Sequence, residues 1–114
     1  MKRPTIGLSE KVKIQGREVA AKVDTGASRC SIDLNLAAVL HLGPIIGIRD
    51  YTNAHGTTTR PVIRAKLEVG GKRFNAIFNV VDRKRLKYKV LIGESIIRRG
   101  KFIIDPIKKW NLRY

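Results

Sequence analysis

The feature that most limits the fold of this chain is a pair of alternating apolar runs on either side of Gly70-Gly71. Apolar side chains occupy every second position over residues 63–69 and again over residues 74–80, with mostly polar or charged residues between them. A period of two predicts β-strands, and the paired glycines allow the positive φ angles of a tight hairpin turn. The sequence therefore predicts a core hairpin over residues 62–81, with Pro61 at a strand start or an edge.

The first part of the chain shows the same alternation over residues 11–23, with a turn at Gln15-Gly16. This second hairpin delivers Asp24 to the end of a strand. Two short helices are expected, one over residues 34–40 with Asp33 as its N-cap and one over residues 94–99 that stops at Gly100. The predicted class is therefore all-β with one or two short helices.

The strand that ends at residue 23 leads directly into Asp24-Thr25-Gly26-Ala27. A carboxylate on a turn of small residues can approach a copy of itself, and two close carboxylates share a proton and can activate water. Thr25 can brace such a turn, and Gly26 allows close approach of backbone. The alternative is ordinary turn chemistry, because Asp and Gly commonly follow a strand.

Chain length adds a condition to the catalytic interpretation. The 114 residues contain one Asp-Thr-Gly and no second copy, which is too little for a two-lobed aspartic peptidase. If Asp24 is half of a catalytic pair, the other half comes from a second protomer across a two-fold axis. The sequence then predicts a homodimer.

The order of Asp24-Thr25-Gly26-Ala27, a glycine-containing hairpin and Leu91-Ile92-Gly93 resembles a retropepsin protomer, the half-molecule form of aspartic peptidase. A closer resemblance spans roughly residues 6–106. Over this span the chain is similar to the family called ATP-dependent zinc proteases, whose members are often found beside ribosomal-protein glutamate ligases. The segments that carry it are residues 21–27, 60–67, 70–74, 91–93 and 101–106.

The resemblance implies a single retropepsin-like domain over residues 1–114, with an acid-protease closed barrel in each protomer of a two-fold dimer. It implies Asp24 as the catalytic residue and no cofactor. A polar loop over residues 52–59 would be a flap that covers an extended peptide substrate, although an exposed hairpin tip has the same composition. An aromatic tail over residues 107–114 would build the dimer, unless it is a free terminus. The residues implied to support the site or bind substrate are Thr25, Gly26, Ala27, Asn53, Ala54, His55, Gly56, Thr57, Ile92 and Gly93.

The chain departs from the retropepsin pattern at one pair of positions. Retropepsins usually carry Arg after the apolar-apolar-Gly motif and an acid just past Asp-Thr-Gly-Ala. Here Glu94 follows Gly93, and Arg29 lies past the motif. The double exchange of sign predicts a reversed ion pair between Arg29 and Glu94.

The formal net charge of +15 attracts polyanions or acidic proteins, although a solvated basic surface has the same charge. A dense basic loop over residues 82–89 contains the candidate nucleic-acid patch Arg83, Lys84, Arg85 and Lys87, with a solvated turn as the favoured alternative. The single cysteine, Cys30, excludes an internal disulfide and favours a buried thiol and a cytoplasmic location. No apolar run is long enough to cross a membrane, so no membrane partner is expected.

No paired His or Cys spacing predicts a metal site, and no phosphate-binding loop predicts ATP binding. Two functions remain open from the sequence. The first is an aspartic endopeptidase that acts as a homodimer on an extended, possibly acidic peptide. The second is a non-catalytic basic β-domain that binds RNA or an acidic or ribosomal protein partner.

Overall fold

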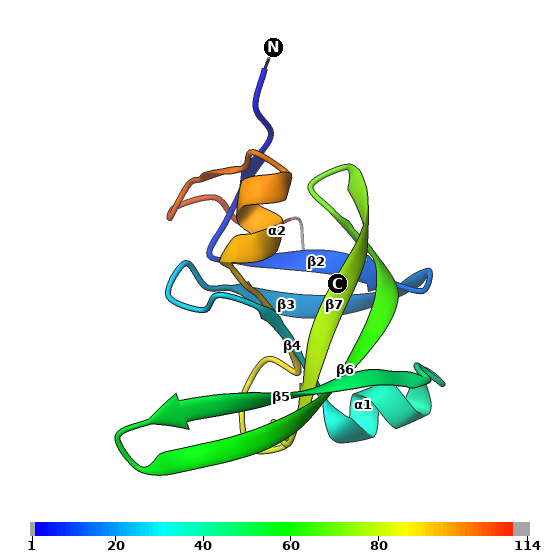
Figure 1. The fold of residues 1–114 in the computed structure, drawn as a ribbon. Coiled ribbons are helices and arrows are strands. Elements are labelled where there is room, and N and C mark those ends of the chain that lie inside the picture. The colour runs from blue at the N-terminus through cyan, green and yellow to red at the C-terminus, as the bar shows by residue number, and fades with distance from the viewer. Residues whose placement is uncertain (1, 111–114) are drawn as a thin grey trace.

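The computed structural model describes residues 2–110, and most of these residues lie in strands (Figure 1). The predicted all-β class with two short helices is confirmed. The elements in chain order are β1 (Thr5–Ile6), β2 (Ser9–Ile14), β3 (Arg17–Val23), β4 (Cys30–Asp33), α1 (Leu34–Val39), β5 (Ile45–Asn53), β6 (Gly56–Val69), β7 (Lys72–Val81), β8 (Val90–Ile92), α2 (Glu94–Arg99) and β9 (Ile103–Ile104).

Seven strands form one sheet in the order β2-β3-β8-β4-β7-β6-β5, and β2 pairs additionally with β6. Strand β8 lies between β3 and β4, parallel to β3 and antiparallel to β4. This insertion brings residues 90–92 beside the strand that ends at Asp24, although almost seventy positions of sequence separate them. Sheet order therefore joins the two motifs that the sequence analysis singled out.

Alternation along the strands forms the core, as expected for a sheet with one wet face. In β2 the side chains of Val12 and Ile14 are buried between exposed lysines, and in β6 those of Ala65 and Leu67 are buried in the same way. The short strand β8 is buried along its whole length, which explains its continuous apolar sequence.

The predicted hairpins over residues 11–23 and 62–81 are confirmed, with turns at Gln15-Gly16 and Gly70-Gly71. One boundary differs from the expectation. Strand β6 begins at Gly56 and runs through Pro61 instead of starting after it. Before Val62, β6 pairs only with β5, so the other side of this part of the strand is an open edge. Pro61, which has no N–H group, is tolerated there because no strand on that side needs a hydrogen bond from it.

Both predicted helices are confirmed. Asp33 caps α1 by accepting hydrogen bonds from the backbone N–H groups of Asn35 and Leu36 at 3.1 and 3.2 Å. Helix α2 ends at Gly100 as expected, but Gly100 has a right-handed φ of −81°. The side chain of Phe102 occupies the space that a Cβ on Gly100 would need, so packing and not backbone conformation accounts for glycine there.

The start and the end of the described chain pack against each other. Strand β1 pairs in parallel with β9, and the buried Glu10 carboxylate accepts hydrogen bonds from Gly7 N–H at 2.7 Å and from Lys108 Nζ at 2.8 Å. Trp110 Nε1 donates to Ser9 Oγ at 2.9 Å. Residues 105–110 therefore fold back on their own chain, whereas the remainder of the tail, expected at a dimer interface, lies outside the described residues.

Within residues 2–110, no helix is both long enough and apolar enough to cross a membrane.

Candidate active site

The Asp24 turn is held by three hydrogen bonds. Asp24 N–H donates to the carbonyl of Ile92 at 2.9 Å, which connects the turn to β8. Gly26 N–H donates to Asp24 Oδ1 at 2.8 Å, and Ala27 N–H donates to the Asp24 carbonyl at 3.3 Å. The carboxylate is half-buried, whereas Thr25 and Gly26 are exposed. The turn therefore presents a fixed carboxylate with access to solvent, bordered by small residues.

A second connection fixes the far side of the turn. The N–H groups of Glu94 and Ser95, at the start of α2, donate to the carbonyls of Ala27 and Ser28 at 2.7 and 3.1 Å. These N–H groups have no partner inside a helix, so the Asp24 turn satisfies them. The predicted site residues Asp24, Ala27 and Ile92 are thus brought into one hydrogen-bonded unit, together with the Gly93 that joins β8 to α2.

The predicted flap is a hairpin of β5 and β6 that extends as a long arm from the body of the molecule (Figure 1). Its tip, Ala54-His55, is exposed, and His55 N–H donates to Asn53 Oδ1 at 2.8 Å. Gly56 follows with a φ of +121°, which glycine adopts without strain. Below the tip, the hydroxyl groups of Thr52 and Thr57 lie 3.0 Å apart. The expected hairpin is present, and its role as a lid stays a prediction.

Within the chain, the expected pair between Arg29 and Glu94 is not formed. Glu94 Oε1 accepts instead from Arg98 Nε at 2.6 Å, because residues four apart face each other on a helix. Arg29 Nη1 donates to the Tyr51 hydroxyl at 3.4 Å, and its guanidinium carbon lies 5.7 Å from the centre of the Tyr51 ring. Arg60 lies 4.4 Å from the same ring. A pair between protomers stays a prediction.

Tyr51 is a residue that the sequence analysis missed. It stands on β5 between two guanidinium groups, one from the segment after the Asp24 turn and one from β6. Cation–π contacts of this kind contribute roughly 0.5–1 kcal/mol each at exposed sites. Tyr51 pairs with Thr58 near the tip of the β5–β6 arm and so connects this part of the arm to Arg29, which lies past the Asp24 turn. An isolated Tyr in a polar strand carried no signal for that contact.

The candidate nucleic-acid patch is divided by the structure. Arg83 is half-buried, and its Nε donates to the carbonyl of Tyr88 at 3.0 Å, so this side chain is committed to its own loop. Lys84, Arg85 and Lys87 are exposed. Of the four residues of the candidate patch, Arg83 therefore donates to its own loop, whereas the other three side chains are exposed, and a nucleic-acid-binding role of the patch stays a prediction.

Asp33 joins this loop to α1. Its side chain is only 3 % exposed, and Oδ1 accepts from Arg83 N–H at 2.7 Å while Oδ2 accepts from the two N–H groups of α1. Burial alone would raise the pKa of Asp33, but these three hydrogen bonds and the charge of Lys89 outweigh burial and hold the pKa below its ordinary value. Asp33 thus acts as an ionised structural cap.

Cys30 is fully buried at the start of β4, as the sequence predicted. Burial raises the pKa of the thiol to about 11, and hydrogen bonds with Gly93 and Ser95 and the charge of Arg99 offset that rise only in part. A thiol that stays protonated and inaccessible is a poor nucleophile and a poor metal ligand. Among residues 2–110, no three His, Cys, Asp or Glu side chains are grouped to hold a metal ion.

A cavity of about 390 Å³ lies beside the Asp24 strand. It separates the loop over residues 82–89 from Lys22, which lines it two positions before Asp24. The sequence analysis missed this cavity because its walls come from three separate segments. The residues that line it are Leu8, Ser9, Lys22, Arg83, Leu86, Lys87 and Tyr88.

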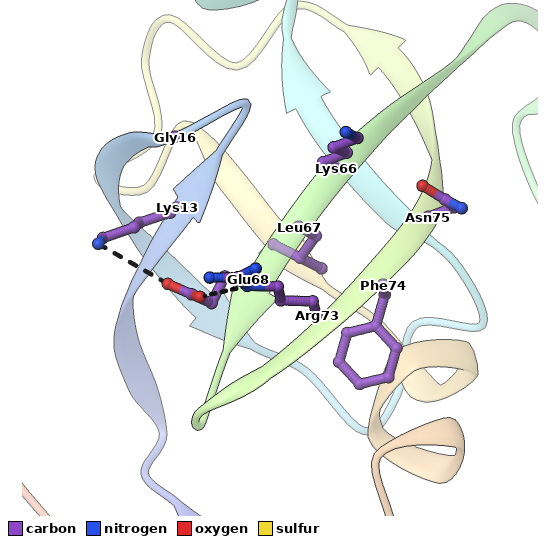
Figure 2. Close-up of a pocket in the computed structure, with 8 residues that line it drawn as sticks. All are labelled: Lys13, Gly16, Lys66, Leu67, Glu68, Arg73, Phe74 and Asn75. Atoms are coloured by element: carbon purple, nitrogen blue, oxygen red, sulfur yellow. Dashed lines mark hydrogen bonds and ion pairs between the residues drawn. The ribbon is translucent and has the colours of Figure 1, made fainter.

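A second pocket, of about 480 Å³, is lined by residues of β2, β6 and β7 and by Gly16 of the β2–β3 turn (Figure 2). Its wall contains an ion-pair chain in which Glu68 binds Lys13 at 3.8 Å and Arg73 at 3.0 Å. None of the predicted site residues lines this pocket, so its position does not bear on Asp24.

Comparison with solved structures shows the fold. A protein of unknown function from Legionella pneumophila is 20% identical, with a TM-score of 0.68 over 96% of this chain and 98% of its own. The protease of simian foamy virus is 20% identical, with a TM-score of 0.61 over 79% of this chain and 91% of its own. A retropepsin-like aspartic protease from Rickettsia conorii is 24% identical, with a TM-score of 0.65 over 80% of this chain and 70% of its own. The fold is therefore retropepsin-like.

No curated protein matches the sequence significantly. The family model described as "gag-polyprotein putative aspartyl protease" matches residues 11–99, a span that includes the Asp24 turn, the β5–β6 arm and β8. The match covers most of the chain and contains the hydrogen-bonded unit around Asp24. The chain therefore belongs to the gag-polyprotein aspartyl protease family.

Proposed function

We propose that this protein is a retropepsin-like aspartic endopeptidase that acts as a homodimer, with one Asp24 from each protomer. The observation that carries the proposal is the fixing of the Asp24 turn from both ends, by Ile92 on one side and by the start of α2 on the other. A turn held in this way can meet its symmetry mate without rearrangement, which lowers the cost of assembling a catalytic pair. Family membership and the retropepsin-like fold support the same function.

In the proposed reaction, the two Asp24 carboxylates share one proton because two adjacent negative charges are unfavourable. The ionised carboxylate takes a proton from a bound water molecule, which attacks the carbonyl carbon of the scissile peptide bond. The protonated carboxylate donates its proton to the carbonyl oxygen. Collapse of the tetrahedral intermediate, with proton transfer to the leaving nitrogen, yields a carboxylate and an amine. No step uses a metal ion or a nucleotide.

The remaining predicted residues have supporting roles in this proposal. Thr25 braces the two turns across the two-fold axis, while Gly26 and Ala27 form the floor of the cleft beneath the substrate backbone. The β5–β6 arm, with residues 53–57 at its tip, closes over the peptide and excludes water.

The proposed fold of each protomer is a closed barrel. The β2–β6 pairing supports the closed barrel, since it joins the first strand of the sheet order to β6.

The reaction is tested by digestion of a mixed peptide library, with products identified by mass spectrometry. Asp24→Asn is expected to abolish cleavage and to leave the circular dichroism spectrum and the unfolding midpoint close to those of the wild type. Glu18→Gln is the matched control, because it removes an exposed carboxylate of β3 far along the strand from the turn. Cleavage that persists in Asp24→Asn would reject the proposed function.

The homodimer is tested separately by sedimentation equilibrium over a range of protein concentrations near neutral pH. A two-protomer mass that persists on dilution is expected. A monomer at every concentration, with and without a bound peptide, would leave Asp24 without its partner and would reject the shared catalytic pair.

The alternative of a basic RNA-binding domain gains no support from the loop geometry, since Arg83 is held by the loop itself. We therefore propose one function.

A further inference from the structure

The pocket of about 480 Å³ at β2, β6 and β7 is lined by more cations than carboxylates. Its cations are Lys13 on β2, Lys66 on β6 and Arg73 on β7, and its one carboxylate is that of Glu68 on β6. Glu68 is paired in register with Lys13 on one side and with Arg73 on the other, and Lys66 lies two positions before it. Residues that are opposite each other or two positions apart share one face of a sheet. The four side chains therefore form one charged surface, which we call the β2–β6–β7 face.

The carboxylate of Glu68 holds two of these cations in place. It binds Lys13 Nζ at 3.8 Å and Arg73 Nε at 3.0 Å, as the dashed lines show (Figure 2). The Arg73 side chain is 88% exposed, and among residues 2–110 its two Nη groups bind no acceptor. A guanidinium group has five N–H donors, so four remain for a ligand after the Nε contact with Glu68. The ion-pair chain therefore positions both cations and leaves most of the Arg73 donors available.

A row of further cations continues along β6. Arg64 and Lys66 are exposed, and neither forms an ion pair within the described part of the chain. Two positions of a strand span roughly 7 Å, so the two charges follow each other along the face. The Lys66 backbone is fixed by Gln15, whose Oε1 accepts from Lys66 N–H at 2.6 Å and whose N–H donates to the Lys66 carbonyl at 2.9 Å. A strand that is held in this way presents two unpaired cations to an anionic partner.

The pocket offers charge and little surface for stacking. Phe74 is the one aromatic residue among those that line it, and the Phe74 ring packs edge-on against Phe102 and lies 5.4 Å from the guanidinium carbon of Arg99. Arg99 also donates to the Asn75 carbonyl at 3.3 Å, which adds a cation at the edge of the pocket. A ligand at this face would therefore be held by charge and not by aromatic contacts.

This pattern of charge fits a polymer that carries an anion on every repeating unit. Such a polymer meets a row of cations in any register, whereas a protein segment would need acidic residues at matching positions. Nucleic acids carry a phosphate on every nucleotide, and Lys and Arg bind these phosphates without reading the sequence. A duplex is stiff over short lengths, so a flexible single strand follows a concave surface more readily. The formal net charge of +15 attracts such a strand to the protein.

We propose that the β2–β6–β7 face binds the phosphate backbone of a single-stranded nucleic acid and does not recognise its bases. The proposal goes beyond the peptidase function and does not depend on it. Gly16 lines the pocket just before β3, and Asp24 follows the end of β3, whose seven residues span roughly 23 Å. A strand bound at the face therefore leaves the Asp24 turn accessible.

The face is tested by fluorescence anisotropy with a labelled single-stranded oligo-uridine and the full chain at several salt concentrations. Three or four phosphate contacts predict that the logarithm of the affinity falls with the logarithm of the salt concentration at a slope of about −2 to −3. The double variant Arg64→Gln with Lys66→Gln is expected to make this slope shallower by about 1.4 and to lower the affinity about tenfold. An oligo-cytidine of the same length is expected to bind as the oligo-uridine does, because the bases are not recognised.

The matched control is Lys84→Gln with Arg85→Gln, which removes the same two charges from exposed positions of the loop over residues 82–89. This control is expected to bind as the wild type does. All four side chains are exposed, so both double variants are expected to keep the unfolding midpoint of the wild type.

No binding by the wild type, no loss in the Arg64 and Lys66 variant, or equal losses in both double variants would overturn the face. Tighter binding of a poly-aspartate peptide of the same charge than of the oligo-uridine would overturn the assignment to nucleic acid. Library cleavage that depends on Asp24 would still stand in each case, so failure of the face is distinguishable from failure of the peptidase function.

Discussion

The Cα of Gly93 lies against the backbone of Arg29, and a Cβ at Gly93 would collide with the Arg29 carbonyl and nitrogen. The contact joins the end of β8 to the segment that follows the Asp24 turn. Backbone atoms cannot move aside as a flexible side chain can, so only glycine fits. The glycine of the apolar-apolar-Gly motif is therefore required by packing behind the turn.

Gly93→Ala is expected to destabilise the folded chain by about 1–3 kcal/mol, the usual cost of forcing extra atoms into a packed region. The measurement is the free energy of unfolding from urea titration. Gly47→Ala is the control, because its Cβ would meet only a Val62 methyl group at 3.3 Å. Equal effects of the two substitutions would contradict the proposed role of the Gly93–Arg29 contact.

Asp33→Asn is expected to lower the free energy of unfolding by about 1–3 kcal/mol at neutral pH, because a charged acceptor of three N–H groups becomes a neutral amide. The pKa of Asp33 is lower in the folded chain than its ordinary value of 3.8. The contribution of the Asp33 carboxylate to the free energy of unfolding is therefore complete above about pH 4 to 5, and it is lost as the pH falls through the folded-state pKa.

The difference in stability between the wild type and Asp33→Asn should thus shrink on acidification below pH 4. Unfolding titrations between pH 2.5 and pH 7 measure this difference, with the exposed Asp50→Asn as the control. A difference that stayed constant down to pH 2.5 would mean that folding does not lower the pKa of Asp33.

Cys30 is expected to resist alkylation by iodoacetamide at pH 8 in the folded protein and to react readily in denaturant, because the folded thiol is buried and has a pKa raised to about 11. The raised pKa of Cys30 also predicts how the stability of the fold depends on pH. The unfolded thiol ionises near its ordinary value of 9.0 while the folded thiol does not, so stability should fall as the pH rises from about 9 towards 11.

Mass spectrometry of the alkylated protein measures the reaction, and Cys30→Ala is the control for the pH dependence. Complete alkylation of the folded protein within the time needed in denaturant would show that the thiol is accessible. An identical slope above pH 9 in Cys30→Ala would show that another group causes the loss of stability.

A double-mutant cycle on Glu94 and Arg98 is expected to give a coupling energy of about 0.3–0.5 kcal/mol, the usual value for exposed pairs four residues apart on a helix. The cycle on Arg29 and Glu94 should give a coupling near zero for unfolding under solution conditions in which sedimentation shows a monomer, because within the chain Arg29 contacts Tyr51 instead. Coupling between Arg29 and Glu94 that exceeds the value for Glu94 and Arg98 would contradict the described contacts. A coupling that appears only in dimer dissociation would identify an ion pair between protomers.

Much of the local structure could be predicted from the sequence. The alternation on either side of Gly70-Gly71 predicted β6 and β7, and Asp33 predicted the start of α1, because hairpin turns and helix caps depend on residues a few positions apart. The site at Asp24 could be predicted as a strand-end turn for the same reason. Its partner Ile92 could be inferred only from the resemblance to retropepsins, since no local pattern connects residues so distant in sequence.

The partners of the charged side chains could not be predicted from the sequence, for one shared reason. The expected Arg29–Glu94 pair was based on the exchange of sign relative to retropepsins, but within the chain Glu94 pairs with Arg98, four residues along the same helix. In the basic loop, backbone carbonyl groups accept hydrogen bonds from the side chains of Arg83 and Lys89, which the composition of the loop did not indicate. A long charged side chain can reach several possible hydrogen-bond or ion-pair partners. Which partner it binds depends on the positions of all these partners in the folded chain.

The sequence by itself therefore determined the hairpins over residues 11–23 and 62–81 with their turns, the two helices and the position of Asp24 after a strand, because periodicity and turn chemistry act over a few residues. Tertiary structure alone decided which charges are paired, which cationic side chains bind the carbonyl groups of the 82–89 loop, and that a cavity opens beside Lys22 of β3. Those outcomes depend on the insertion of β8 between β3 and β4, which brings distant segments together. Contacts between such segments are set by packing of the whole sheet and not by any short stretch of the chain.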